Sequence, residues 1–254
     1  MQERHKDREL YFKEQGITTA KYVVPYVRDF VSFSADTKVL EVGCGEGGNM
    51  TPFLDLGCET VGVDISPTQI EKAEYFLSTN KYKKYKVIAE DIYKVSPEEL
   101  GTFDLIFLRD VIEHIPNQEQ FFEVIGKFLK KDGVIFFGFP PWRMPFGGHQ
   151  QICSSKFLSV LPYFHLLPKF LYKPFLKIFG ESDGTIVSLE EIKDTGISIS
   201  RFNKGLRSNH FKVLKNTHYL INPNYETKFN LKGRILYSLF KIPHLSDFYT
   251  TAVY

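Results

Sequence analysis

The chain has 254 residues, of which 43% are hydrophobic and 24% are charged, a balance typical of a globular rather than a disordered protein. Its formal net charge of +2 gives no case for binding nucleic acid through a basic surface. The three cysteines are odd in number and far apart, which favours a reducing compartment over a disulfide framework. The first ten residues are too charged for a signal peptide, and no apolar run reaches the roughly 18 residues of a membrane-spanning helix, so we expect a cytoplasmic protein.

Helical and strand patterns alternate over the first 140 residues. A helical stretch covers residues 4–33, with a break expected near Gly16. Five apolar runs follow, at 38–42, 60–65, 85–92, 103–110 and 133–140. Amphipathic stretches predict helices at 48–56, 67–79, 96–100 and 117–130. Continuous apolar strands that alternate with helices predict an α/β fold, in which helices cover both faces of a parallel sheet.

The alternation stops at residues 151–204, a segment rich in Phe, Leu, Pro and Lys. Pro168 and Pro174 each predict the start of a short helix, and Ser188 forms a capping-box pattern with Glu191.

Strand patterns return at 211–221 and 247–254. The sequence therefore predicts one domain over 1–254, with an N-terminal helical lid at 1–34. It also predicts a mainly helical insertion at 151–204, after the fifth strand, which would act as a lid over the substrate.

The segment VLEVGCGEGG contains the spacing G-x-G-x-x-G at Gly43, Gly45 and Gly48, after a predicted strand and before a predicted helix. Glycines let a backbone pass close to a ligand, and a helix N-terminus attracts negative charge. Asp64 stands at the end of the next predicted strand, where a carboxylate can accept both hydroxyl groups of a ribose. These features predict a nucleotide- or nucleoside-binding site.

Two further acids bear on the nature of that ligand. Glu41 stands two residues before the first glycine, where it would face an amine or a cation rather than a pyrophosphate. Asp91 ends the third predicted strand, where it can accept a hydrogen bond from the exocyclic amine of adenine. Acids at three successive strand ends favour a positively charged ligand without phosphate, and an NAD-dependent oxidoreductase stays the alternative.

Five segments together resemble the class I S-adenosylmethionine-dependent methyltransferases: VLEVGCGEGG (39–48), VGVDIS (61–66), AEDI (89–92), FDLIFLRDVIEHIP (103–116) and KFLKKDGVIFFGFP (127–140). The resemblance implies a Rossmann-like doubly wound sheet, mostly parallel, with a C-terminal antiparallel hairpin. It also implies S-adenosylmethionine as cofactor and S-adenosylhomocysteine as product.

The same resemblance implies a role for each site residue. Gly43 and Gly45 would face the methionine part, and Glu41 would orient its amino group. Asp64 would hold the ribose, and Arg109 would approach the cofactor mainly through its backbone. The residues expected around the adenine are Ile65, Asp91 and Ile92.

On the acceptor side, RDVIEHIP leaves the fourth strand and places His114 near the edge of the sheet where ligands bind. The ending is similar to that of quinol O-methyltransferases. His114 could act in catalysis, or it could cap and orient the loop together with Glu113. Asp110, Glu113 and His114 also share one face of a helix and could hold a divalent metal ion, although the sequence does not commit to a metal.

The segment PPWRMPFGGHQ, residues 140–150, follows the fifth strand. His149 would be the base nearest to a hydroxyl acceptor, with an ordinary pKa near 6.5 that suits proton removal at neutral pH. The alternative is a loop packed beneath the insertion, with His149 bonded to a backbone carbonyl.

Residues 157–179 carry many aromatic side chains, with lysines at every fourth position from Lys169 to Lys177. This segment could be a lid over the acceptor, a peripheral membrane contact or a dimer contact, so the protein could be a monomer or a homodimer.

The leading hypothesis is therefore an enzyme that methylates a small molecule, at a hydroxyl group on an apolar, aromatic or lipid-like compound. The alternatives are methylation of a sugar in glycan synthesis, a regulatory protein that binds the cofactor without catalysis, and the NAD-dependent oxidoreductase. No nucleic-acid partner is expected.

Overall fold

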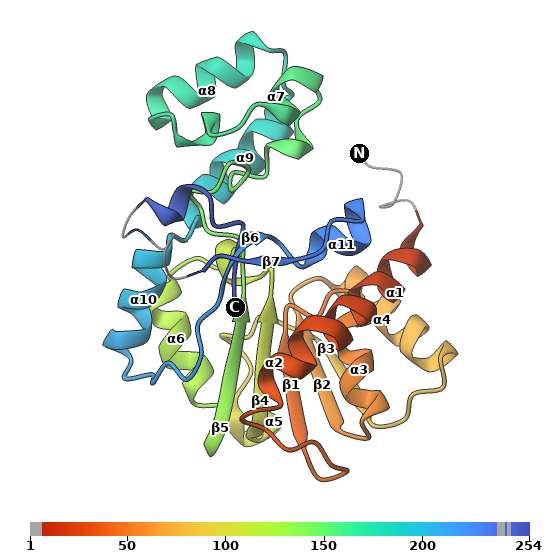
Figure 1. Ribbon diagram of the computed structural model, residues 1–254. Coiled ribbons are helices and arrows are strands. Elements are labelled where there is room, and N and C mark those ends of the chain that lie inside the picture. The colour runs from red at the N-terminus through yellow and green to blue at the C-terminus, as the bar shows by residue number, and fades with distance from the viewer. Residues whose placement is uncertain (1–6, 238–241, 243–244) are drawn as a thin grey trace. The chain divides into compact units, whose positions relative to one another are not determined.

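The computed structural model describes residues 7–237, 242 and 245–254 (Figure 1). The chain divides into two compact units. The first unit runs to Arg109 and resumes over Glu123–Phe137. The second consists of Asp110–Phe122 and Gly138–Tyr254.

The first unit is built on a five-stranded sheet with the strand order β3-β2-β1-β4-β5. Its strands are β1 (Lys38–Val42), β2 (Glu59–Asp64), β3 (Tyr85–Ala89), β4 (Phe103–Arg109) and β5 (Leu129–Gly138). β1 pairs in parallel with both β2 and β4, and β2 pairs in parallel with β3. The strand order reverses between β1 and β4, and in open α/β sheets ligands bind outside the carboxyl ends of the strands at such a point. The predicted Rossmann-like sheet is confirmed.

Both faces of this sheet are covered, as the continuous apolar strands predict. Leu105, Ile106, Phe107 and Leu108 are each at most 1% exposed. Since successive side chains of a strand point to opposite faces, four consecutive buried residues require a layer on each side.

Helical elements of the first unit follow the predicted pattern, with two differences near the N-terminus, one of which is that the helical stretch expected over 4–33 ends at Val27. They are α1 (Arg8–Thr18), the π-helical turn η2 (Thr19–Val23), α2 (Val24–Val27), η3 (Gly48–Met50), α3 (Thr51–Asp55), α4 (Pro67–Thr79) and α5 (Pro97–Leu100). The break expected near Gly16 is wrong, because α1 continues through it. A Cβ at Gly16 would lie 2.6 Å from Thr51 Oγ1, so the glycine serves close packing instead. The helical path departs from α geometry at η2.

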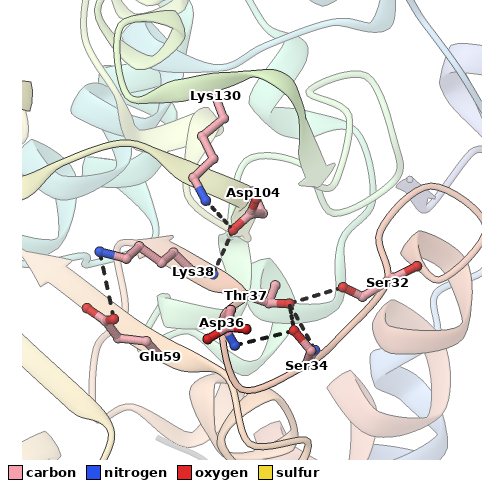
Figure 2. Close-up of polar contacts among 8 residues, drawn as sticks. All are labelled: Ser32, Ser34, Asp36, Thr37, Lys38, Glu59, Asp104 and Lys130. Carbon is pink, nitrogen blue, oxygen red and sulfur yellow. Dashed lines mark hydrogen bonds and ion pairs between the residues drawn. The ribbon is translucent and has the colours of Figure 1, made fainter.

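The first unit has a hollow of about 400 Å³ at the amino ends of the strands. There Asp104 Oδ2 accepts hydrogen bonds from Lys38 N and Lys130 Nζ, each at 2.8 Å, and Thr37 Oγ1 donates to Ser32 O at 3.0 Å (Figure 2). These polar groups bond to one another. The hollow is at the end of the sheet away from the glycine loop.

The second unit contains a separate three-stranded sheet with the order β7-β6-β8. Its strands are β6 (His218–Ile221), β7 (Arg234–Ile235) and β8 (Ala252–Val253), and both pairings are antiparallel. The C-terminal antiparallel pair is thus confirmed, but its strands are shorter than predicted and they form a sheet of their own.

The second unit also contains several helices. The α-helices are α7 (Lys156–Val160), α8 (Lys169–Ile178), α9 (Asp183–Thr195), α10 (Ile199–Ser208) and α11 (Asn224–Phe229). The 3-10 turns are η4 (Ile112–His114), η5 (Gln150–Ile152), η6 (Phe164–Leu166) and η8 (Ser246–Phe248), while α6 (Gln118–Gly126) begins in this unit and ends in the first.

Two predicted helix starts in the insertion are wrong. Pro174 lies inside α8 rather than at a boundary. Because proline has no N–H, it cannot bond to the carbonyl four residues earlier, that of Phe170, whose side chain is 74% exposed. Ser188 lies inside α9, because Ser182 caps that helix by accepting a hydrogen bond from Thr185 N at 3.2 Å.

The helices of the insertion have a core of their own, formed by Cys153, Leu158, Phe164, Tyr172, Leu176, Ile186 and Leu189. None of the helices in the described part of the chain has the length and apolar character needed to span a membrane.

Candidate functional site

The glycine loop joins β1 to η3 at the carboxyl end of the sheet. Gly43, Gly45 and Gly47 have φ values of 70°, 52° and 80°, a region that costs other residues energy. Gly43 N donates to Val63 O at 2.7 Å, which ties the turn to the end of β2. The predicted motif therefore forms a tight strand-to-helix turn, in which Gly47 also needs to be glycine.

Gly48 has a different role from the turn glycines. A Cβ at this position would lie 2.4 Å from Phe12 O and 2.7 Å from Gln15 Oε1, both in α1. The N-terminal helix therefore packs directly on the glycine loop, and α1 contacts η3 and α3 (Figure 1).

Asp64 is fixed beside the loop. Its Oδ2 accepts from Gly45 N at 2.8 Å and its Oδ1 accepts from Ser66 N at 2.9 Å. Each carboxylate oxygen retains lone pairs for a further donor. The adjacent Ile65 is 72% exposed, so an apolar side chain stands open next to a fixed acid. This arrangement fits a ribose on the carboxylate and a flat base on the isoleucine.

Asp91 and Ile92 follow β3 on the same edge, since Asp64 of β2 is in register with Ala89 of β3. Asp91 is half-buried and accepts a hydrogen bond from Tyr93 N at 3.1 Å, while Ile92 is 7% exposed. Both residues therefore follow the strand next to β2, at the same end of the sheet as Asp64 and Ile65.

Glu41 is completely buried at the end of β1. Its Oε1 accepts from Asn49 Nδ2 at 2.8 Å, and its Oε2 has no hydrogen-bond partner among the described residues. Burial raises the pKa of Glu41 well above its ordinary value, against the hydrogen bond from Asn49 and the charge of Arg109. A buried carboxylate oxygen without a donor fits an ammonium group, so these residues suit the methionine part of the expected cofactor.

Arg109 does more than the sequence predicts. Its side chain donates from Nη1 to Thr19 Oγ1 and to Asn49 Oδ1, each at 2.8 Å. The guanidinium thus links the N-terminal helical segment to the residue that bonds Glu41.

In the second unit, the structure brings together the two predicted catalytic histidines. The ring centroids of His114 and His149 are 4.9 Å apart at an interplanar angle of 71°. Glu113 Oε1 lies 3.9 Å from His114 Nε2. His149 and Asp110 both have positive φ, at 53° and 57°, and such strain in non-glycine residues clusters at functional sites.

A metal ion could be held here by a set that differs from the one expected. Glu113, His114 and His149 each offer a ligand atom, and these atoms lie within 4.8 Å of one another. Two imidazoles with one carboxylate are ligands that transition metals accept. Asp110, expected in the set, instead accepts a hydrogen bond from Asn224 Nδ2 at 2.9 Å.

The protonation states of this cluster depart from ordinary values. Burial, and then the charge of Asp110, raises the pKa of Glu113 well above its usual range. Burial, and then the charge of His114, lowers the pKa of His149 to about 4. Burial also lowers the pKa of His114, although 43% of that side chain is exposed and solvent limits the shift. Both histidines are therefore neutral at pH 7, and the ordinary pKa expected for His149 does not apply.

The loop at 140–150 packs beneath the insertion, as one of the two interpretations of the sequence expects. Trp142 packs on the insertion: a Cβ at Gly196 would lie 2.3 Å from its ring, and Trp142 O accepts from His165 Nε2 at 2.8 Å. A Cβ at Gly148 would lie 2.2 Å from the Cβ of His165. The loop is thus packed against the insertion, while His149 is turned towards His114.

Three polar residues of these sites were not predicted. Thr19 and Asn49 contact Arg109 in the first unit, and Asn224 contacts Asp110 in the second. Asn49 directly follows the glycine motif, and that position was the one available signal. Thr19 and Asn224 reach their partners through the fold alone.

Comparisons with known proteins agree with this geometry. A family model described as "Methyltransferase domain" matches residues 33–156. The "Ubiquinone biosynthesis O-methyltransferase" of Pelagibacter ubique is 34% identical over 116 residues, which cover 43% of this chain and 47% of that protein. The protein of the same name from Bartonella tribocorum is 28% identical over 72% of this chain and 73% of its own length. The match spans about half the length of the Pelagibacter protein.

Among solved structures, PKMT2 from Rickettsia typhi in complex with AdoHcy has a TM-score of 0.53 and 22% identity, and the match covers 76% of this chain and 43% of that one. That likeness supports the fold, while the family model covers the glycine loop and the acids at the strand ends. Together, the family model, the curated relatives and the fold support a class I S-adenosylmethionine-dependent methyltransferase.

Proposed function

We propose that this protein transfers a methyl group from S-adenosylmethionine to a hydroxyl group of a small, apolar or aromatic molecule. The observation that carries the proposal is Glu41, a buried carboxylate with one oxygen lacking a donor, at the same sheet edge as the fixed carboxylate of Asp64. An ammonium and a ribose presented by one ligand would satisfy both groups. A phosphate would leave Glu41 Oε2 without a donor, which argues against NAD.

When bound, the sulfonium supplies an electrophilic methyl group and leaves as S-adenosylhomocysteine. In the proposed reaction the acceptor oxygen forms the new bond to the methyl carbon as the carbon–sulfur bond breaks. The hydroxyl proton passes to the neutral imidazole of His149, with His114 beside it. The chain's own contribution is to orient both reactants, exclude water and hold that proton.

An oxygen acceptor is supported by the names of the relatives from Pelagibacter ubique and Bartonella tribocorum, although identity is low. Methylation of a sugar, loss of catalysis and NAD-dependent oxidation stay the alternatives. The shift in melting temperature with S-adenosylmethionine, S-adenosylhomocysteine or NAD added separately tests the cofactor class. Stabilisation by NAD alone would contradict the proposal. A cytoplasmic location also stays a prediction, supported by three cysteines that are free and buried.

We expect Asp64→Ala to weaken the binding of S-adenosylhomocysteine about ten- to a hundredfold, because it removes the acceptor for the ribose hydroxyls. Isothermal titration calorimetry measures this directly. The matched control is Asp55→Ala, which removes an exposed acid of α3 that accepts from Tyr82 Oη at 2.9 Å. Equal affinities in Asp64→Ala and the wild type would exclude Asp64 from the cofactor site.

A peripheral contact with an anionic lipid surface, through residues 157–179, is also proposed. Apolar side chains stand open there, with exposed fractions of 67% for Val160, 74% for Phe170 and 80% for Ile178. The charged residues of 152–179 are four lysines, and two of these, Lys156 and Lys177, form no ion pair with a described residue. Exposed apolar groups flanked by cations suit an anionic membrane surface.

This contact predicts that the protein sediments with vesicles containing anionic lipid at low salt and is released at high salt. The double variant Phe170→Ser, Ile178→Ser is expected to stay in the supernatant. Val187→Ser, which changes a 52%-exposed residue of α9, is the control. Absence of the wild type from the pellet at low salt would rule out the membrane contact. A concentration-dependent dimer that is lost in the double variant would instead indicate a contact with a second copy of the chain.

A further inference from the structure

Hydrogen-bonded side chains, of which Thr19 and Asn49 are buried and Arg109 is half-buried, connect the N-terminal helical segment to the buried Glu41 without interruption. Arg109 Nη1 lies 2.8 Å from Thr19 Oγ1 and 2.8 Å from Asn49 Oδ1. Thr19 Oγ1 donates to Asn49 Oδ1 at 2.9 Å, and Asn49 Nδ2 donates to Glu41 Oε1 at 2.8 Å. Thr19 and Glu41 are 0% exposed and Asn49 is 3% exposed, so water does not compete for these bonds.

The hydrogen bonds of this network all run in one direction, from the donor Arg109 through Thr19 and Asn49 to the acceptor Glu41. Arg109 Nη1 donates to Thr19 Oγ1, to Asn49 Oδ1 and, at 3.3 Å, to Gln15 O, so its two protons are shared among three acceptors. The Thr19 hydroxyl donates its own proton to Asn49 Oδ1. Both bonds hold Asn49 by its oxygen, which leaves its amide nitrogen to face Glu41. A rotated Asn49 amide would place oxygen against the carboxylate and nitrogen against the guanidinium. The network therefore fixes Oε1 of Glu41, and the other carboxylate oxygen, Oε2, is left without a donor.

The local backbone explains how Thr19 enters this network. Thr19 begins the π-helical turn η2, in which Val24 N bonds to Thr19 O, one residue further than in an α-helix. Such turns occur often at functional sites, because they change which side chains face inward. The close contact of Gly48 with Phe12 O holds α1 on the loop at the same time.

We propose that Thr19, Asn49 and Arg109 are positioning residues that present Glu41 Oε2 to the ammonium group of the bound cofactor. The N-terminal helical segment is then a working part of the cofactor site rather than a cover alone. This inference rests on the proposed function, since it assumes a ligand with an amino group at Glu41.

The test measures how strongly each variant recognises that amino group. Calorimetry compares S-adenosylhomocysteine with the analogue in which hydrogen replaces the amino group. In the wild type the analogue is expected to bind about ten- to a hundredfold more weakly, as for a lost hydrogen bond to a charged group. In Thr19→Val and in Asn49→Leu this ratio is expected to fall below about threefold, whereas Thr19→Ser, which keeps the hydroxyl, restores it.

The control is Thr18→Val, since the Thr18 hydroxyl donates to Glu14 O at 2.9 Å, outside the network. A purely structural role would weaken both ligands equally and leave the ratio unchanged, which would overturn the inference. Failure of the wild type to bind S-adenosylhomocysteine would overturn the proposed function instead. If Thr19→Val does not fold, as judged by its melting curve, Asn49→Leu gives the same ratio.

Discussion

Replacing His149 with Ala is expected to slow turnover about 10²- to 10⁴-fold at saturating cofactor, without changing the affinity for S-adenosylhomocysteine. A positioned base contributes a factor of this size when an acceptor must lose a proton. With a pKa lowered to about 4, His149 is neutral at pH 7 and able to accept one. Because a base of low pKa is also a weaker base, we expect the lower part of that range.

The pH dependence of the rate gives an independent check on His149. Its imidazole is protonated below its pKa and then cannot act as a base. Since burial moves that pKa from an ordinary value near 6.5 to about 4, the wild-type rate should stay level down to about pH 5 and fall below it. His149→Ala should lose this acidic limb, whereas His210→Asn, at an exposed histidine, should keep it.

The variant His114→Ala distinguishes the role of His114 from that of His149. If His149 is the base, His114→Ala should retain most of the turnover and shift the limb to higher pH, because the charge of His114 lowers the pKa of its neighbour. Wild-type turnover in both single variants would mean that neither histidine is the base. A rate that then falls with a chelator would point to a metal ion at Glu113, His114 and His149.

Gly48→Ala is expected to lower the melting temperature of the first unit by about 6–12 °C and to remove measurable binding of S-adenosylhomocysteine. The added Cβ would lie 2.4 Å from Phe12 O, a backbone atom in the middle of α1. The atoms cannot separate by a rotamer change, so α1 must move off the glycine loop. Overpacking costs about 1–3 kcal/mol of stability, and a clash with the backbone is expected at the upper end of that range. Each kcal/mol lowers the melting temperature of a chain of this size by about 2–4 °C.

The control for this variant is Gly184→Ala in α9, where the nearest atom to an added Cβ is Ser182 Oγ at 4.0 Å. Alanine in a helix without a clash is expected to be neutral or to stabilise by about 0.4–1 kcal/mol. Differential scanning fluorimetry and calorimetry measure both variants. A Gly48→Ala protein with the melting temperature and affinity of the wild type would show that α1 does not depend on this contact.

The sequence alone determined the strands and the cofactor loop, because both depend on local patterns. Runs such as 103–110 are apolar at consecutive positions, which a strand tolerates when both faces of its sheet are buried. The turn at Gly43 and Gly45 needs positive φ values, which glycine adopts most easily, so the spacing of the glycines in the sequence predicts the turn. Asp64 follows from the same logic, since the end of β2 must meet the glycine loop.

The tertiary structure alone decided the contacts between distant segments. Thr19 reaches Arg109 across 90 positions, and Asn224 reaches Asp110 across 114. The approach of His114 to His149, and the fall in the pKa of His149, depend on burial that no local pattern encodes. Hydrogen bonding and desolvation act through space, whereas helix, strand and turn preferences act over a few residues, and this difference separates what the sequence predicts from what the fold adds.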